Sequence, residues 1–248
     1  MKLLRYKVSI LDNQTQEPAD LLEASVRKLE VETGWTVSAA TQEACTLTYE
    51  KSIELRFSPS AFISNGQESK PSEKENAPIS LTYVADTAEY RAAPLTTEKR
   101  FFLQIIRAQL QCLQQSKTKI KDLLRFVGNS WRTTVSVAEE IKALDVGYIA
   151  DAAITGDESM AVRSIIFLKA MQTKVEATFD LRVQSKEGTS GLSLITRATV
   201  RVCYGETLNE KKMSEFLESR IKGAEGYGAW VHAARELEEK LISRGKKS

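Results

Sequence analysis

Hydrophobic side chains between Leu95 and Trp131 recur at steps of three and four residues. This spacing puts them along one face of an amphipathic helix, so we predict a single long helix here with that face buried. The threonines at 96–97 can cap its start, and the Gly128–Asn129 pair is typical of a helix end. With a rise of about 1.5 Å per residue the helix would extend roughly 45 Å, enough to serve two small modules.

The stretch before this helix predicts a helix and then strands. The first helix is expected from Pro18 to Thr33, and Gly34 is its expected stop. Apolar and polar residues then alternate with a period of two, which is typical of half-buried antiparallel strands. These strands are expected around residues 47–49, 53–57 and 79–83. The segment from Ser58 to Pro78 is polar and rich in breakers, and it is expected to be a surface loop.

The same order of elements follows the long helix. The second set comprises a helix over 134–144 that ends at Gly147, strands over 162–168, 175–183 and 192–204, and helices over 213–221 and 227–241. Helix, antiparallel meander and helix therefore occur twice. The pattern predicts an α+β fold of two modules, over 18–127 and 128–248, that are joined through the long helix. Residues 1–17 are left unassigned.

Composition narrows the class of protein. The 248 residues are 42% hydrophobic, which is enough for real cores, and 35 basic against 33 acidic residues give a net charge of only +2. So weak an overall charge gives no reason to expect binding to nucleic acid or to a membrane surface. The three cysteines are widely separated and lack CxxC spacing, which argues against both a disulfide framework and a zinc site. Without a long apolar run or a signal sequence, we expect a soluble protein of a reducing compartment.

Four sequence runs carry a resemblance to a known family. They are LTYEKSIELRFSPSAF, LTTEKRFFLQIIRAQLQCLQQSKTKIKDLLRFVGNSW, VAEEIKAL and VCYGETLNEKKMSEFL. In this order, together with the helix, meander and helix arrangement, they resemble the C-terminal tandem RWD region of the fungal members of the kinetochore scaffold family called blinkin, or kinetochore-null. The resemblance runs from about Leu21 to the C-terminus.

The resemblance implies a function as well as a fold. It implies two RWD modules in tandem that act as a non-enzymatic scaffold in the nucleus, at the kinetochore. The implied partners are subunits of the MIND complex and a coiled-coil protein of the Zwint type. Through them the module would help link the inner kinetochore to the microtubule-attachment and checkpoint machinery in chromosome segregation. Family members also have long N-terminal regions with docking repeats, so we expect this chain either to be a fragment or to lack that recruiting half.

The RWD fold is similar to the ubiquitin-conjugating fold, so an enzyme with a catalytic cysteine is the alternative to test. Cys45 and Cys203 lie in strand patterns, and Cys112 lies in the middle of the long helix. A reactive thiolate needs an accessible site with a lowered pKa, whereas these positions favour core packing. No tripeptide like the family's HPN is present, so we predict no catalysis. An RWD-type adaptor in another pathway, such as ubiquitin conjugation, is the alternative function.

Three further motifs give no reason to expect a metal or cofactor. His232 is the single histidine and has no second ligand at metal spacing. The run GAEGYG at 223–228 lacks the GK[ST] ending of a phosphate loop and is better explained as a turn between helices. The run TGDES at 155–159 has too few carboxylates for calcium or magnesium and is typical of a hairpin turn.

The sequence also offers candidate residues for binding a protein partner. In the second module, alternation places four basic residues on the sheet face opposite the helices, in company with Glu176 and Asp180. They are Lys174, Arg182, Arg197 and Arg201. A charged face is usually just solvated, and the other interpretation is a dock for an acidic or amphipathic peptide. Trp131, Tyr227 and Trp230 are the candidate aromatic anchors, although filling a core is the favoured interpretation for the tryptophans.

Overall fold

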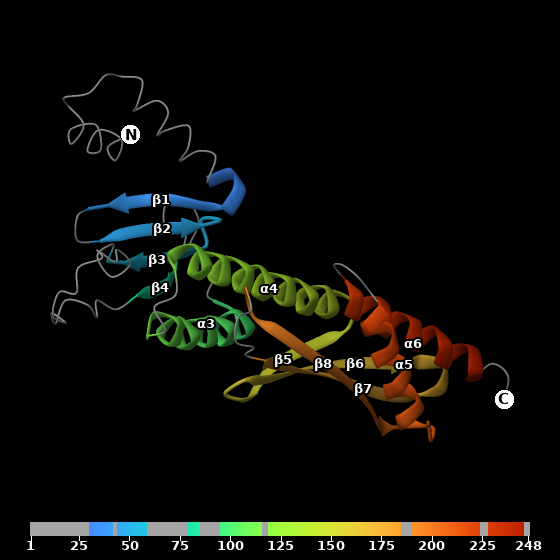
Figure 1. Cartoon of the computed structure of the whole chain (residues 1–248). Coiled ribbons are helices and arrows are strands. Elements are labelled where there is room, and N and C mark those ends of the chain that lie inside the picture. Colours follow the sequence, from blue (N-terminus) through green and yellow to red (C-terminus); the bar gives the residue numbers. More distant parts are fainter. Residues whose placement is uncertain are drawn as a thin grey trace, which may run out of the picture. The chain divides into compact units, whose positions relative to one another are not determined.

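The computed structural model describes residues 30–41, 44–58, 79–84, 95–115, 119–184, 190–223 and 228–245. Within them the chain divides into two compact units, each with its own antiparallel sheet (Figure 1). One unit holds the residues before 95 together with 107–128, and the other holds 95–106 together with the residues from 129 onward. The expected α+β class is confirmed. The predicted module limits, 18–127 and 128–248, stay a prediction.

The sheet of the first unit is a meander of short strands, in blue and cyan in Figure 1. The strands lie in the order β1-β2-β3-β4, and each is antiparallel to the strand beside it. The strands are β1 (Trp35–Ala40), β2 (Cys45–Tyr49), β3 (Ile53–Phe57) and β4 (Ser80–Tyr83). The three predicted strands are therefore confirmed as β2, β3 and β4.

Strand β1 was not predicted, and its irregular register explains why. It lies at the edge of the sheet, and its pairing with β2 shifts between Val37 and Ala39. Such a bulge breaks the period of two on which a strand assignment depends. Only Trp35 of this strand is buried, so the hydrophobic signal is weak as well.

Gly34 ends the first helix as the sequence predicts. Residues 30–33 are helical, the Gly34 amide donates to the Glu30 carbonyl over 2.9 Å, and Gly34 has a φ of +73°. This left-handed conformation suits glycine, which has no Cβ to strain it. A Cβ here would also lie 2.9 Å from Cε2 of Tyr49. The rest of that predicted helix, residues 1–17 and most of the loop over 58–78 lie outside the described residues.

The prediction of one continuous helix that ends near Gly128–Asn129 is wrong on both points. Two helices occupy the region, α3 (Thr97–Gln115) and α4 (Ile120–Gly147). The first stops where the apolar stripe is interrupted by the polar run over 114–119. The second continues through the expected stop at Gly128–Asn129 and includes the helix predicted over 134–144, ending at Gly147 as expected.

Close packing explains a glycine in the middle of α4. The rings of Trp35 and Tyr49 lie 5.1 Å apart, and the Trp35 indole donates to the Leu124 carbonyl over 3.2 Å. A Cβ on Gly128 would lie 3.2 Å from Cε2 of Tyr49 and 3.4 Å from Nε1 of Trp35. Gly128 therefore lets the helix approach this aromatic pair, and the helix bears the cost of a glycine in its interior.

The second sheet is also a meander, with the order β5-β6-β7-β8 and antiparallel pairing throughout. Its strands are β5 (Ile149–Gly156), β6 (Ser159–Leu168), β7 (Thr173–Gln184) and β8 (Ser193–Tyr204). The last three were predicted. Strand β5 was not, because it is an edge strand whose side chains are mostly exposed. The pairing of Gly156 with Ser159 confirms the hairpin turn expected in TGDES.

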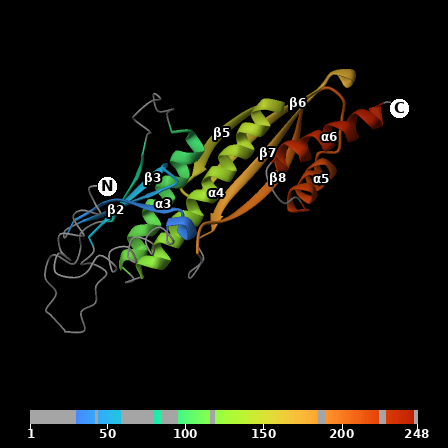
Figure 2. The same ribbon diagram turned by 90° about the horizontal axis from the view of Figure 1, so that it is seen from above.

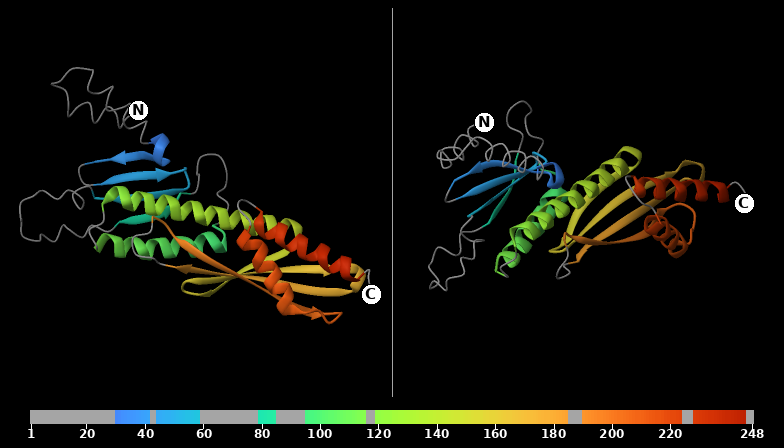
Figure 3. Two further views of the ribbon diagram at one scale, coloured as in Figure 1. Left: turned by 45° about the vertical axis from the view of Figure 1, so that its right-hand side comes forward. Right: turned by 45° about the horizontal axis from the view of Figure 1, so that its top comes forward.

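Helices cover one face of the second sheet (Figures 2 and 3). They are the part of α4 from Asn129 onward, α5 (Glu210–Gly223) and α6 (Ala229–Gly245). Alternate residues of β7 are buried beneath them, from Thr173 to Val183. The Ser130 hydroxyl accepts from the Leu192 amide over 3.1 Å, which ties the start of β8 to α4.

Candidate functional site

The face of the second sheet turned away from the helices carries the predicted basic residues. The register of β7 with β8 places Glu176 opposite Arg201 and Asp180 opposite Arg197. Lys174 and Arg182 occupy the same alternating positions of β7. Lys174, Arg182, Arg197 and Arg201 therefore share one face, as expected from the period of two. Their role in binding stays a prediction.

The same face also carries large apolar side chains, which the sequence analysis did not single out. Tyr204 is 53% exposed, Phe167 47% and Ile149 65%, and Ile195 is exposed toward the other end of the face, where it pairs with Arg182. The register confirms the shared side, because Lys174 pairs with both Phe167 and Tyr204. The Lys174 ammonium lies 5.9 Å from the centre of the Phe167 ring. We call this mixed charged and apolar surface the outer face. It comprises Ile149, Phe167, Lys174, Glu176, Asp180, Arg182, Ile195, Arg197, Arg201 and Tyr204.

The candidate aromatic anchors are placed differently from the basic residues. Trp131 is 1% exposed and Trp230 is 5% exposed, in agreement with the interpretation that the tryptophans fill cores. The Trp230 ring stacks on Phe179 with 4.9 Å between centroids and an interplanar angle of 8°. Tyr227 lies outside the described residues. Neither tryptophan offers an exposed ring, although Trp230 is among the residues that line a groove.

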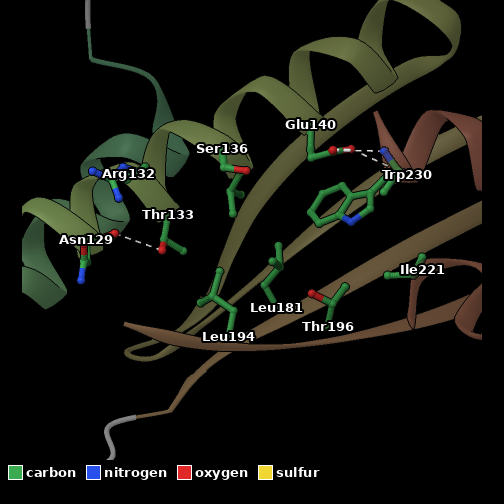
Figure 4. Close-up of a pocket in the computed structure, with 12 residues that line it drawn as sticks. Asn129, Arg132, Thr133, Ser136, Glu140, Leu181, Leu194, Thr196, Ile221 and Trp230 are labelled. Carbon is green, nitrogen blue, oxygen red and sulfur yellow. Dashed lines mark hydrogen bonds between the residues drawn. The ribbon is translucent and has the colours of Figure 1, made fainter. Parts of the chain in front are cut away.

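That groove lies between α4, the helix-covered face of the sheet, and α5 with α6 (Figure 4). It has a volume of about 590 Å³ and is open to solvent. Both polar and apolar side chains line it, which suits a binding groove more than a buried core. Its lining includes Arg132, Val137, Glu140, Leu181, Leu194, Thr196, Ile221 and Trp230.

Glu140 is the acidic member of this lining and is itself buried. One carboxylate oxygen accepts from the Gly228 and Ala229 amides over 2.6 and 3.1 Å, and the other accepts from the Trp230 amide over 3.1 Å. These amides are at the N-terminus of α6, where backbone N–H groups lack partners within the helix. Glu140 thus caps α6 from a different helix, and its negative charge suits the positive end of the helix dipole.

A smaller groove of about 370 Å³ lies where α4 ends. It is lined by Tyr148, Phe167, Arg235 and Glu238, among others. The Tyr148 hydroxyl donates to Glu238 over 2.9 Å. Burial, and then the Glu238 carboxylate that accepts this bond, raise the pKa of Tyr148. The phenol of Tyr148 therefore stays protonated near neutral pH, which does not suit it to act as a general base there.

The cysteines correct one expectation. Core packing was predicted for all of them, but Cys112 and Cys203 are exposed and Cys45 is half-buried. Cys112 lies on the side of α3 away from the apolar stripe. Cys203 is the extra residue at the register shift between β7 and β8, where Lys174 pairs with Tyr204 and Val175 with Val202. The alternation of β8 already puts position 203 on the exposed side with Arg197 and Arg201, so a position within a strand pattern did not imply a place in the core.

The remaining candidate chemistry gives no metal or membrane site within the described residues. His232 is exposed on α6. The described part of the chain contains no group of three or more His, Cys, Asp or Glu side chains that could hold a metal ion. None of its helices is long and apolar enough to cross a membrane.

Comparison with known proteins gives a family match. The model of the Knl1 RWD C-terminal domain matches residues 6–138, which is more than half of the 248 residues. The match includes the first sheet, α3 and α4 up to Ala138. No curated protein matches the chain.

Proposed function

This chain belongs to the Knl1 RWD C-terminal domain family, and from that premise we propose that it is a non-enzymatic docking module of a kinetochore scaffold. Protein–protein interaction is the general role that the family supports. The fold agrees with that role, since each unit is a small sheet covered by helices. Function is nevertheless carried by particular surfaces, because one fold serves many activities.

The partner that we propose is the MIND complex, with a Zwint-type coiled-coil protein bound close by. In this role the module helps link the inner kinetochore to the microtubule-attachment and checkpoint machinery during chromosome segregation, in the nucleus. The resemblance of the sequence runs quoted above to the fungal members of the family supports this finer assignment.

The outer face is the surface that we propose for docking. The observation that carries this proposal is the presence of both interaction types on one face. Four basic residues are spread along β7 and β8, and Ile149, Phe167 and Tyr204 are exposed at the end of the face nearest Lys174. Exposed apolar side chains gathered on one surface mark interaction sites, and basic residues orient an acidic partner. Glu176 and Asp180 each face one arginine across the strands, but the basic residues still outnumber them. The expected ligand is an acidic or amphipathic peptide.

Charge reversal tests this surface. We expect the double variant Arg197→Glu, Arg201→Glu to weaken binding to purified MIND complex by about tenfold or more, and to reduce the dependence of the affinity on salt. Both side chains are exposed, so the fold should be retained within about 0.5 kcal/mol. Titration at several salt concentrations measures the affinity, and circular dichroism measures the fold.

The matched control is Lys211→Glu, Lys212→Glu, which makes the same change in net charge at exposed positions of α5. This control should bind like the wild type. An unchanged affinity of the folded Arg197→Glu, Arg201→Glu variant would exclude the outer face as the dock.

The ubiquitin alternative also has a direct test. We expect no covalent adduct when the chain is incubated with ubiquitin, the activating enzyme and ATP, because the sequence places no activating histidine or basic neighbour at a recognisable spacing from the cysteines. Non-reducing electrophoresis with mass spectrometry measures adducts. Since Cys112 and Cys203 are exposed, a reducible adduct that disappears in Cys112→Ser or Cys203→Ser would establish the enzyme.

A further inference from the structure

The geometry points to a second docking site, at the edge of the second sheet. We propose that the N-terminal half of β8 accepts an extended peptide of a partner protein as a fifth, antiparallel strand. Its apolar side chains would enter the groove of Figure 4 and its acidic side chains would lie beside Arg197. This site adjoins the outer face and shares Arg197 with it, but it is defined by the backbone edge of β8 and by the groove.

The first observation is that the edge of β8 is only half covered. The Val200 amide donates to the Ser214 hydroxyl over 2.8 Å, and the Val202 amide donates to the Glu210 carboxylate over 2.7 Å. Both acceptors belong to α5, which therefore satisfies the C-terminal half of this edge. Edge strands are templates for pairing unless they are covered in this way.

The alternation of backbone groups then identifies the half that is open. Successive residues of a strand direct their N–H and C=O groups to opposite sides. Because Val200 and Val202 direct theirs to the edge, Leu194 and Thr196 do so too. Both also line the groove, so open space lies next to them. Among the described residues, neither backbone amide has a hydrogen-bond partner on that side.

The groove offers an apolar floor for one set of side chains. In Figure 4, Leu181 and Leu194 lie on the strands below α4, and Trp230 lies beyond them at the start of α6. Val137 of α4 and Ile221 of α5 complete the apolar lining. A peptide strand beside β8 would direct alternate side chains into this space, which is how an added strand gains specificity beyond its backbone bonds.

Charge determines what the other set of side chains should be. In the N-terminal half of β8, Ile195 and Arg197 point away from the helices. Arg197 has an acidic neighbour, Asp180, on the β7 side, and its other side is the open edge. An acidic residue on an added strand would face Arg197 from the open side. A second copy of this chain fits poorly, because the open half of its β8 presents Ser193, Ile195 and Arg197 outward and so offers no acidic side chain to Arg197. The occupant is therefore a partner segment that alternates apolar and acidic residues.

A blocked peptide of alternating valine and glutamate is a suitable probe. We expect it to bind the full chain in fluorescence anisotropy, and to slow hydrogen exchange of the Leu194 and Thr196 amides, measured by NMR, by about tenfold or more at saturation. In an antiparallel fifth strand the inward valines direct their amides to β8. N-methylation of the valines should abolish binding, whereas N-methylation of the glutamates should preserve it.

Two substitutions at one residue test the same edge from the protein side. Thr196→Pro removes the edge-facing N–H and leaves the bonds between β7 and β8, which use the intervening residues. We expect it to weaken binding by about tenfold or more, and Thr196→Ala, which keeps the N–H, to stay within about twofold of the wild type. If Thr196→Pro does not fold, the two N-methylated peptides decide the question.

Several outcomes would overturn the proposal. They are the absence of saturable binding up to about 1 mM peptide, equal binding by the two N-methylated peptides, and binding that leaves the Leu194 and Thr196 amides unprotected. Protection that appears without peptide as the chain dimerises would assign the edge to a second copy. None of these results depends on affinity for the MIND complex, so failure here and failure of the proposed function are separable.

Discussion

Replacing Glu140 by alanine is expected to lower the free energy of unfolding by about 3 kcal/mol, because it leaves the three amides at the start of α6 without their acceptor. The Gly228 and Trp230 amides are buried, so water does not readily replace the lost carboxylate. The favourable charge at the helix N-terminus is lost as well. Urea unfolding followed by circular dichroism measures the difference.

Two further variants separate the cap from nonspecific effects. Glu140→Gln keeps one oxygen for the Gly228 and Ala229 amides but directs an NH₂ group toward the Trp230 amide, so an intermediate loss of about 1–2 kcal/mol is expected. Glu139→Ala changes the exposed neighbour on α4 and should stay within about 0.5 kcal/mol of the wild type. Equal stabilities for Glu140→Ala and Glu139→Ala would show that the cap contributes nothing.

Much of the fold could be predicted because the hydrophobic periods are clear. Strands β2, β3, β6, β7 and β8 bury alternate residues, and α5 ends at the predicted Gly223. The missed strands, β1 and β5, are both edge strands with a register shift. Their pattern is weak because an edge strand buries less and a bulge changes which side chains face the core.

Gly128 shows why one residue type can mislead. A glycine near the end of an apolar stripe is typical of a helix stop. Gly128 instead lies inside α4, where the absence of a Cβ lets the rings of Trp35 and Tyr49 pack closely against the helix. Those residues are distant in the sequence, so no local pattern distinguishes a glycine that ends a helix from one that allows close packing.

The outer face and the groove also differ in how far a local sequence pattern could predict them. The basic residues of the outer face were predictable because one period of two decides which side chains share a side. The groove was not, because it collects residues from α4, β7, β8, α5 and α6. Glu140 did carry a local signal, since it lies three residues after Val137 and four before Leu144, on the buried stripe of α4. A carboxylate at a core position indicates a specific buried partner.

Replacing Trp230 by alanine is expected to lower the free energy of unfolding by about 4 kcal/mol, the usual loss when a large buried aromatic side chain is deleted. The stacked contact with Phe179 is lost, and a cavity opens beside the groove. The backbone bond from residue 230 to Glu140 is unaffected by the change, so the loss reports on the side chain. Urea unfolding measures it, with His232→Ala, an exposed change on α6, as the control within about 0.5 kcal/mol.

This prediction decides how binding data at Trp230 should be understood. Since the ring is buried, a weaker partner affinity in Trp230→Ala would reflect unfolding or a reshaped groove rather than the loss of an exposed anchor. Trp230→Phe, which keeps an aromatic ring over Phe179, should recover about half of the lost stability. If Trp230→Ala were as stable as the wild type but failed to bind, the buried position of the ring would be wrong and Trp230 would be a partner anchor after all.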